Sequence, residues 1–352
     1  MTCSAPLFRI DIEKQPGLAA RCTNVLGLIP VNGGIIGSGQ IFASAGIDLL
    51  RLTPLPCGQC IACRINYSRS WAVRMMCEAE YHPHNYFITL TYSDSFLPRD
   101  KCYDLSDHKL KDSNLQPKHL SSFMKRLREN IRREYGVTGV KFFAAGEFGE
   151  LMDRPHYHAC LFGMPDLSSD LTFLKQNGSV IHFTHDLIGD SWCDPDSGIN
   201  IGFHSISEFN FETAAYTGAY MTKKIKGLAN KIEAADPELL AECDGNIRFN
   251  AFARMSNRPG LGYQYFKDHS FDILRTDSIP YQKDHKAFLA KSPRYFDKLF
   301  DYIDPNILDT NRELRTTLGN ARFTCMSNND RLRYHSQAGV AAKLNQETRG
   351  QL

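Results

Sequence analysis

The sequence predicts an α+β fold in which helices flank a central antiparallel sheet. Segments with strand-like alternation and segments with helical periodicity are mixed along residues 64–227, without the strict alternation that a doubly wound parallel sheet requires. Two strand segments, at 140–145 and 156–162, are joined by a connection rich in glycine and proline turn signals, which is typical of a hairpin. We therefore expect one antiparallel layer with helices packed on it.

The composition is that of a globular protein. With 352 residues, 42% of them hydrophobic and 23% charged, the chain can bury one large core or two modest ones. A net charge of +2 is too small to indicate a nucleic-acid partner, so such evidence has to come from local clusters. No apolar stretch reaches the roughly 18 to 20 residues of a membrane span. The odd count of eleven cysteines and the charged N-terminus favour a reducing cytoplasm over secretion.

The first half of the chain is expected to contain a loop-rich extension, a helix, a strand and a second helix. Residues 1–56 carry glycine and proline turn signals and no sustained helical period. Helical spacing of apolar residues runs over 64–82 and ends before Pro83. Residues 86–92 alternate and are aromatic or β-branched, as in a central strand. A basic amphipathic helix is expected over 118–134, preceded by Pro117.

The hairpin is followed by further strands at 180–184 and 199–206. The segment 211–226 is helical by composition, with Asn210 as a cap and Gly227 after it. A turn is expected at 257–260 and another helix at 287–302. Residues 330–352 are mostly polar and are expected to form a tail.

His156 and His158 are the most informative residues for function. Because side chains alternate along a strand, both imidazoles point to one face, where neutral ring nitrogens bind a divalent ion. Glu147 is the candidate third ligand, with Glu150 as the alternative, and a carboxylate favours Mg or Mn. A His-x-His pair is also compatible with an ordinary polar or hydrogen-bonded position in a strand.

Tyr216 and Tyr220 are four residues apart and share one face of the expected helix, so they are candidate nucleophiles. An aromatic stripe packed on the sheet is the more common role of such a pair. Lys223 and Lys224, about one turn further on, are candidates for lowering a phenol pKa or holding a phosphate. They also suit a solvated cluster that complements the helix dipole.

The helix over 118–134 is a candidate nucleic-acid surface. It carries six basic side chains against Glu129 and Glu134, and such a face can follow a phosphate backbone, although basic faces also serve solubility. The basic residues are Lys118, Lys125, Arg126, Arg128, Arg132 and Arg133.

Cys57, Cys60 and Cys63 have the spacing of a zinc knuckle, whose fourth ligand would be Cys77, His82 or His84. Three reduced thiols are an equal alternative because no second Cys-x-x-Cys follows. The sequence contains no Walker motif, so we expect no intrinsic ATP-driven helicase.

Seven blocks in this order resemble the HUH-type rolling-circle replication initiators, and the similarity is greatest to those of gokushovirus-like Microviridae phages. The match covers roughly residues 56–262, whereas residues 1–55 and 263–352 carry little that can be matched. The histidine motif of this family usually has a hydrophobic residue between the histidines, where this chain has Tyr157. The blocks are Pro56-Cys-Gly-Gln-Cys-Ile-Ala-Cys-Arg64, Phe87-Ile-Thr-Leu-Thr-Tyr92, Phe123-Met-Lys-Arg-Leu-Arg128, Gly146-Glu-Phe-Gly-Glu150, Arg154-Pro-His-Tyr-His158, Ala214-Ala-Tyr-Thr-Gly-Ala-Tyr-Met-Thr-Lys-Lys224 and Ser256-Asn-Arg-Pro-Gly260.

The resemblance implies a palm-like antiparallel sheet of about five strands and an endonuclease core over residues 56–262. It further implies that a tyrosine attacks a phosphate of single-stranded origin DNA, leaving a 5′-phosphotyrosine and a free 3′-hydroxyl, and that the strand is later rejoined. The expected setting is the host bacterial cytoplasm, with host helicase, DNA polymerase and single-strand-binding protein as partners.

Two other functions remain compatible with the sequence. A metallohydrolase would need further ligands such as His182, His185 and His204, but it gives the tyrosine pair no role. A noncatalytic DNA-binding protein with a zinc knuckle would bind DNA without cutting it. Only a tyrosine transesterase predicts a covalent protein–DNA adduct.

Overall fold

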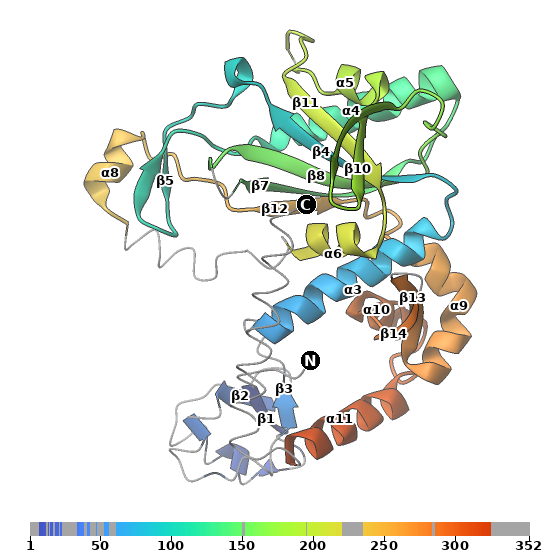
Figure 1. The fold of residues 1–352 in the computed structure, drawn as a ribbon. Helices are drawn as coiled ribbons and strands as arrows, with labels where there is room; N and C mark the ends of the chain where they lie inside the picture. Colours follow the sequence, from blue (N-terminus) through green and yellow to red (C-terminus); the bar gives the residue numbers. More distant parts are fainter. Residues whose placement is uncertain are drawn as a thin grey trace. The chain divides into compact units, whose positions relative to one another are not determined.

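The computed structural model describes residues 61–149, 152–194, 196–219, 235–283 and 286–324, together with short pieces between residues 7 and 55. The chain divides into two compact units (Figure 1). One unit contains residues 68–293, and the other contains residues 1–67 and 294–350. Each unit is described separately below.

A seven-stranded antiparallel sheet is the centre of the first unit, in the part of the chain that the structure describes. The α+β prediction is confirmed, and the sheet is wider than the expected five strands because one further strand is added at each edge. The strands, in spatial order, are β12 (Phe252–Met255), β7 (Lys141–Phe148), β8 (Pro155–Phe162), β4 (Asn85–Tyr92), β11 (Gly202–Glu208), β10 (Val180–Thr184) and β9 (Thr172–Asn177).

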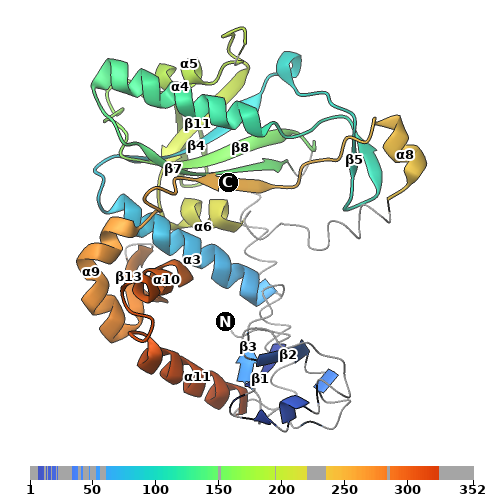
Figure 2. The same cartoon turned by 180° about the vertical axis from the view of Figure 1, so that it is seen from behind.

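Helices α4 (Pro117–Tyr135) and α5 (Asp186–Ser191) cover one face of this sheet (Figures 1 and 2). Helix α4 begins at a proline, ends at the left-handed Gly136 and buries its predicted apolar stripe. Burial of each such large side chain stabilises the fold by about 1.5–3 kcal/mol. The core on this face includes Ile88, Leu90, Leu120, Phe123, Leu127, Tyr157, Leu161, Trp192 and Ile206.

Helix α6 (Phe211–Ala219) packs on β7 and β8 at the opposite face (Figure 2). Its first turn is capped as predicted, because Thr213 N donates to Asn210 Oδ1 over 2.9 Å. Helix α3 (Ile61–Ala79) lies against it: Ser68 Oγ donates to Ala215 O over 2.6 Å, and a Cβ on Gly218 would be 3.0 Å from Ser68 O. The expected continuation of α6 to residue 226 lies outside the described residues.

The remaining elements of this unit are small. They are the 3-10 turn η2 (Asp94–Phe96), the hairpin of β5 (Cys102–Asp104) and β6 (Lys109–Lys111), α8 (Pro237–Glu242), α9 (Tyr263–Thr276), and the hairpin of β13 (Ser278–Lys283) and β14 (Lys286–Lys291).

The helix predicted over 287–302 was wrong in its first part. Lys286–Lys291 is strand β14, which pairs in register with β13, and the helix α10 (Arg294–Ile303) starts only after Pro293. Pairing with β13 is a nonlocal interaction that overrides local propensity, and proline favours the start of a helix over its interior.

The second unit contains a small sheet where a loop-rich extension was expected. Its strands β1 (Leu7–Asp11), β2 (Gly34–Ser38) and β3 (Thr53–Leu55) are antiparallel in the order β2-β1-β3. Partners such as Arg9 and Ile36 are far apart in sequence, so no local pattern indicated the pairing. Helix α11 (Asp309–Thr324) follows α10, and Arg315 binds Asp297 through a 2.8 Å ion pair. Among the described residues, no helix is both long and apolar enough to cross a membrane.

Candidate metal and nucleophile site

Glu147, His156 and His158, referred to below as the candidate triad, lie on the face of the sheet that carries α6. Glu147 on β7 is paired directly with His156 on β8, and His158 is paired with Thr89 on β4. Tyr157 lies between the two histidines and points into the core on the other face. The period of two along β8 therefore separates core from site, as the sequence predicted.

The three ligand atoms of the candidate triad lie within 4.8 Å of one another. Glu147 Oε1 is 3.0 Å from Nε2 of His156 and 3.0 Å from Nε2 of His158. Burial of the Glu147 carboxyl favours a higher pKa, but its hydrogen bonds with the two histidines outweigh this and hold the pKa well below the usual range. Glu147 is therefore a carboxylate at neutral pH.

The outer ring nitrogens of both histidines are also oriented. His156 Nδ1 is 3.1 Å from Arg154 O, and His158 Nδ1 is 3.0 Å from Thr89 Oγ1. Because a carbonyl only accepts, His156 donates through Nδ1, and the neutral ring then directs a lone pair from Nε2 toward the Glu147 carboxylate. A cation between these two acceptors resolves their repulsion, so the donor set fits a divalent metal ion.

The Tyr216 hydroxyl is part of the same cluster. It donates to Glu147 Oε1 over 2.9 Å and lies 3.3 Å from His158 Nε2. Phe87 on β4 stacks on the His158 ring at 5.5 Å and meets the Tyr216 ring edge-on at 6.4 Å. Helix α6 thus places a phenol oxygen beside the candidate metal ligands, as the sequence analysis expected of this tyrosine.

Residues that the sequence analysis did not single out support the hairpin between β7 and β8. Arg248 lies 3.4 Å from the centroid of the Phe148 ring and forms ion pairs with Asp104 at 2.9 Å and Asp153 at 2.8 Å. These contacts fix the residue next to Glu147. The roles of Phe87 and Thr89 follow from strand register, whereas no local signal in the sequence identified Arg248.

Several predicted site residues lie outside the described residues, namely Glu150, Tyr220, Lys223, Lys224, Cys57 and Cys60. Cys63 and Cys77 are described and buried. His82 binds Glu78 through a 2.9 Å contact. Within the described ranges, the candidate triad is the one group of three or more His, Cys, Asp and Glu side chains that meets metal-binding geometry.

The histidines considered for a metallohydrolase are not joined to the candidate triad. His185 Nδ1 accepts from Leu187 N over 3.1 Å and caps α5, while His204 Nε2 accepts from His185 N over 3.1 Å. His182 is buried on β10. Two of the three histidines are therefore hydrogen-bonded to backbone amides.

The basic residues of α4 lie across the sheet from the candidate triad. Arg126 Nε donates to Ser191 O over 3.1 Å, and Arg128 donates to Val140 O over 2.8 Å. Arg132 is paired with Glu129 at 2.5 Å, whereas Lys125 and Arg133 are exposed. The structure brings none of these five basic groups to the candidate triad.

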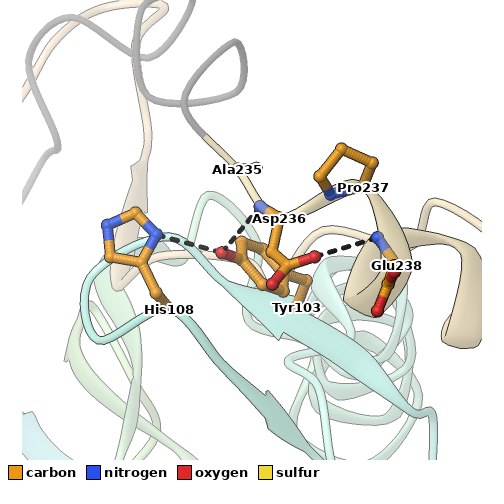
Figure 3. Close-up of a pocket in the computed structure, with 6 residues that line it drawn as sticks. All are labelled: Tyr103, His108, Ala235, Asp236, Pro237 and Glu238. Carbon is orange, nitrogen blue, oxygen red and sulfur yellow. Dashed lines mark hydrogen bonds between the residues drawn. The ribbon is translucent and has the colours of Figure 1, made fainter.

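A separate pocket of about 730 Å³ lies beside β5 and α8 (Figure 3). Its lining contains no member of the candidate triad. The Tyr103 hydroxyl oxygen accepts from Asp236 N over 3.2 Å and lies 3.0 Å from His108 Nδ1, while Asp236 caps α8. These hydrogen bonds hold the short helix in place. The lining residues are Tyr103, His108, Ala235, Asp236, Pro237 and Glu238.

Residues 85–225, which include the candidate triad and Tyr216, match the family model of the ORF2-type replication-associated proteins. The chain is 33% identical over 264 residues to Replication-associated protein ORF2 of Spiroplasma virus 4, covering 74% of this chain and 72% of that relative. The chain belongs to this family of replication-associated proteins.

Two more distant relatives carry the same description. Over 201 residues, this replication-associated protein is 28% identical to Replication-associated protein VP4 of Bdellovibrio phage phiMH2K, covering 56% of this chain and 57% of the relative. It is 25% identical over 249 residues to Replication-associated protein ORF4 of Chlamydia phage 1, covering 70% and 53%. No solved structure is significantly similar to it.

Proposed function

We propose that this replication-associated protein initiates phage DNA replication by nicking single-stranded origin DNA through a tyrosine transesterification. The observation that carries the proposal is the Tyr216 hydroxyl, 2.9 Å from Glu147 Oε1 and 3.3 Å from His158 Nε2. A phenol held beside ligands suited to a divalent ion is the arrangement that phosphoryl transfer to tyrosine requires.

In the proposed reaction the Tyr216 oxygen attacks the scissile phosphorus. A tyrosine O–P bond forms while the bond from phosphorus to the 3′ oxygen breaks. The phenol loses its proton, and the departing 3′ oxygen takes one up, leaving a 5′-phosphotyrosine and a free 3′-hydroxyl. One ester replaces another, so the bond energy needed for later rejoining is retained without ATP.

The residues of the candidate triad would hold the divalent ion, Mg or Mn, through two imidazole nitrogens and one carboxylate oxygen. When bound, such an ion neutralises charge on a phosphate oxygen. Glu147 Oε1 orients the Tyr216 phenol by accepting its hydrogen bond, and the edge of the Phe87 ring fixes the phenol from the side. Arg154 O and Thr89 orient the two imidazoles.

The remaining expectations belong to the same proposal. Tyr220 would be the second nucleophile that cuts again when the circle is joined, and Lys223 and Lys224 would hold the phosphate. The 3′-hydroxyl would be extended by host polymerase, with host helicase and single-strand-binding protein opening the duplex in the host cytoplasm. Zinc bound by Cys57, Cys60 and Cys63 would be structural.

The test is covalent capture on a denaturing gel. Labelled single-stranded oligonucleotides that tile the genome encoding this chain are incubated with the protein and Mg or Mn. A protein–DNA adduct is expected from one tile, and it should be absent with a chelator and in His156→Ala and His158→Ala. Tight binding to the tiles without an adduct in either metal would contradict the proposal and favour a noncatalytic DNA-binding protein.

Tyrosine variants assign the nucleophile. Tyr216→Phe and the double variant with Tyr220→Phe should retain DNA binding, and the double variant should form no adduct. Tyr302→Phe is the matched control, because Tyr302 is 87% exposed and belongs to the other compact unit. An adduct that persists in the double variant would exclude both tyrosines.

A further inference from the structure

Phe203 lies in the same transverse row of the sheet as two members of the candidate triad. Glu147 pairs with His156, His156 pairs with Thr91, and Thr91 pairs with Phe203. Directly paired residues of neighbouring strands point to the same face, so this row faces α6. Neighbouring strands are about 4.8 Å apart, which places the Phe203 backbone about 10 Å from that of His156.

The Phe203 ring is accessible. The side chain is 68% exposed, although it lies on a face of the sheet that is elsewhere covered by helices. A single exposed phenylalanine needs no explanation on its own. Its alignment with a site suited to binding a phosphate gives the exposure a use, because a nucleotide presents an aromatic base close to each phosphate.

The backbone that carries this ring is held closely against β4. A Cβ on Gly202 would lie 1.9 Å from Thr91 O, so only glycine allows the two strands to approach this closely. Thr91 Oγ1 donates to Phe203 O over 3.3 Å. Phe203 is therefore presented from a rigid strand, which reduces the entropy lost when a ligand stacks on it.

We propose that Phe203 is a stacking platform for one nucleobase of the bound single strand, close to the phosphodiester that the candidate triad faces. The inference rests on the proposed function, because it takes the ligand to be single-stranded DNA. Stacking on an aromatic ring tolerates any base, since every base has a π-face. Phe203 would thus favour unpaired DNA without reading its sequence.

The first test is the affinity of labelled single-stranded oligonucleotides for the full chain, measured by fluorescence anisotropy. Loss of one stacked base weakens binding by about 5- to 140-fold, so Phe203→Ala should show a loss in that range. Phe203→Trp should retain affinity, whereas Phe203→Leu, which is apolar without a ring, should resemble alanine. Equal affinity of the alanine variant and the wild type would overturn the platform.

Phe173→Ala is the matched control. Phe173 is 62% exposed on β9, and it pairs with Phe183, whose partner Ile206 belongs to the core on the α4 face. Its ring therefore belongs to the opposite side of the sheet, and its removal should leave affinity unchanged. A loss as large as that of Phe203→Ala would show that exposed rings act nonspecifically.

An abasic scan identifies the base. One abasic position near the nicked bond should weaken binding to the wild type but cause no further loss in Phe203→Ala, because both changes remove the same contact. Additive losses at every position would contradict the inference. Adduct formation combined with Phe203-independent binding overturns the platform alone. Phe203-dependent binding without any adduct in the wild type overturns the cleavage function and leaves the platform supported.

Discussion

The Tyr216 hydroxyl lies 3.3 Å from His158 Nε2, although 58 residues separate them in sequence. The two rings meet edge to face, with centroids 5.0 Å apart. The tyrosine is on α6 and the histidine is on β8, so their proximity depends on how the helix packs on the sheet. Thr217 contributes to that packing through a 3.6 Å contact with the buried Cys160 thiol.

Replacement of the Glu147 carboxylate should weaken metal binding. Glu147→Gln keeps the shape of the side chain but removes the charge that faces both imidazoles, so we expect Mn affinity to fall more than about 10-fold, a loss that even outer-shell changes produce. Calorimetric titration with Mn measures this without DNA. Glu208→Gln, an exposed carboxylate on β11, is the control. Unchanged Mn affinity in Glu147→Gln would exclude Glu147 as a ligand.

Glu78 should make stability depend on pH in the acid range. Burial favours a higher pKa for this carboxyl, but hydrogen bonds from His82, Lys141 and the Gly262 amide outweigh it and lower the pKa to about 2. A lowered pKa stabilises the fold above the ordinary value near 4.5, and this stabilisation is lost as the pH falls toward 2.

The expected loss in the free energy of unfolding over that pH range is about 3 kcal/mol, from about 1.4 kcal/mol per pKa unit. Urea unfolding at a series of pH values measures it. Glu78→Gln should be less stable at neutral pH and should lack this part of the acid dependence. Parallel pH curves for the two proteins would show that the Glu78 carboxylate contributes nothing.

A side chain at residue 202 should destabilise the sheet. In Gly202→Ala the new Cβ would overlap the Thr91 carbonyl, so the strands must shift, and overpacking of this kind costs about 1–3 kcal/mol. Gly149→Ala is the control, since its Cβ would meet His156 at an ordinary 3.6 Å. Thermal unfolding of both variants tests the prediction, and equal melting temperatures would contradict it.

The basic residues of α4 should separate into two groups. Arg126→Met and Arg128→Met remove hydrogen bonds to backbone carbonyls and should lower the unfolding free energy by about 1–3 kcal/mol each. Lys125→Ala and Arg133→Ala should leave stability unchanged. If this face follows a DNA backbone, each should also reduce the slope of log affinity against log salt by about 0.7.

Measurements of both quantities on all four variants decide between these roles. Arginine variants that unfold like the wild type but bind DNA weakly would show that their side chains exchange carbonyl partners for phosphates. Lysine and arginine surface variants with wild-type salt dependence would remove α4 from the DNA-binding surface.

The sequence by itself determined the fold class and the local geometry of the candidate triad. Alternation along 156–162 placed both histidines on one face because the period of a strand is two, and the hairpin placed Glu147 opposite His156. Asn210, Pro117 and Gly136 marked helix ends by local chemistry. These features depend on residues close together in the chain.

Only the tertiary structure decided which elements meet. It placed the basic helix α4 on the face opposite the candidate triad and brought Tyr216 to His158. It also aligned Phe203 with His156, and it paired Lys286–Lys291 as a strand. Each of these depends on strand order and packing between distant segments, and one sequence carries no periodic signal for such contacts. The chemistry was therefore legible in the motifs, whereas the surface on which DNA would lie was set by the fold.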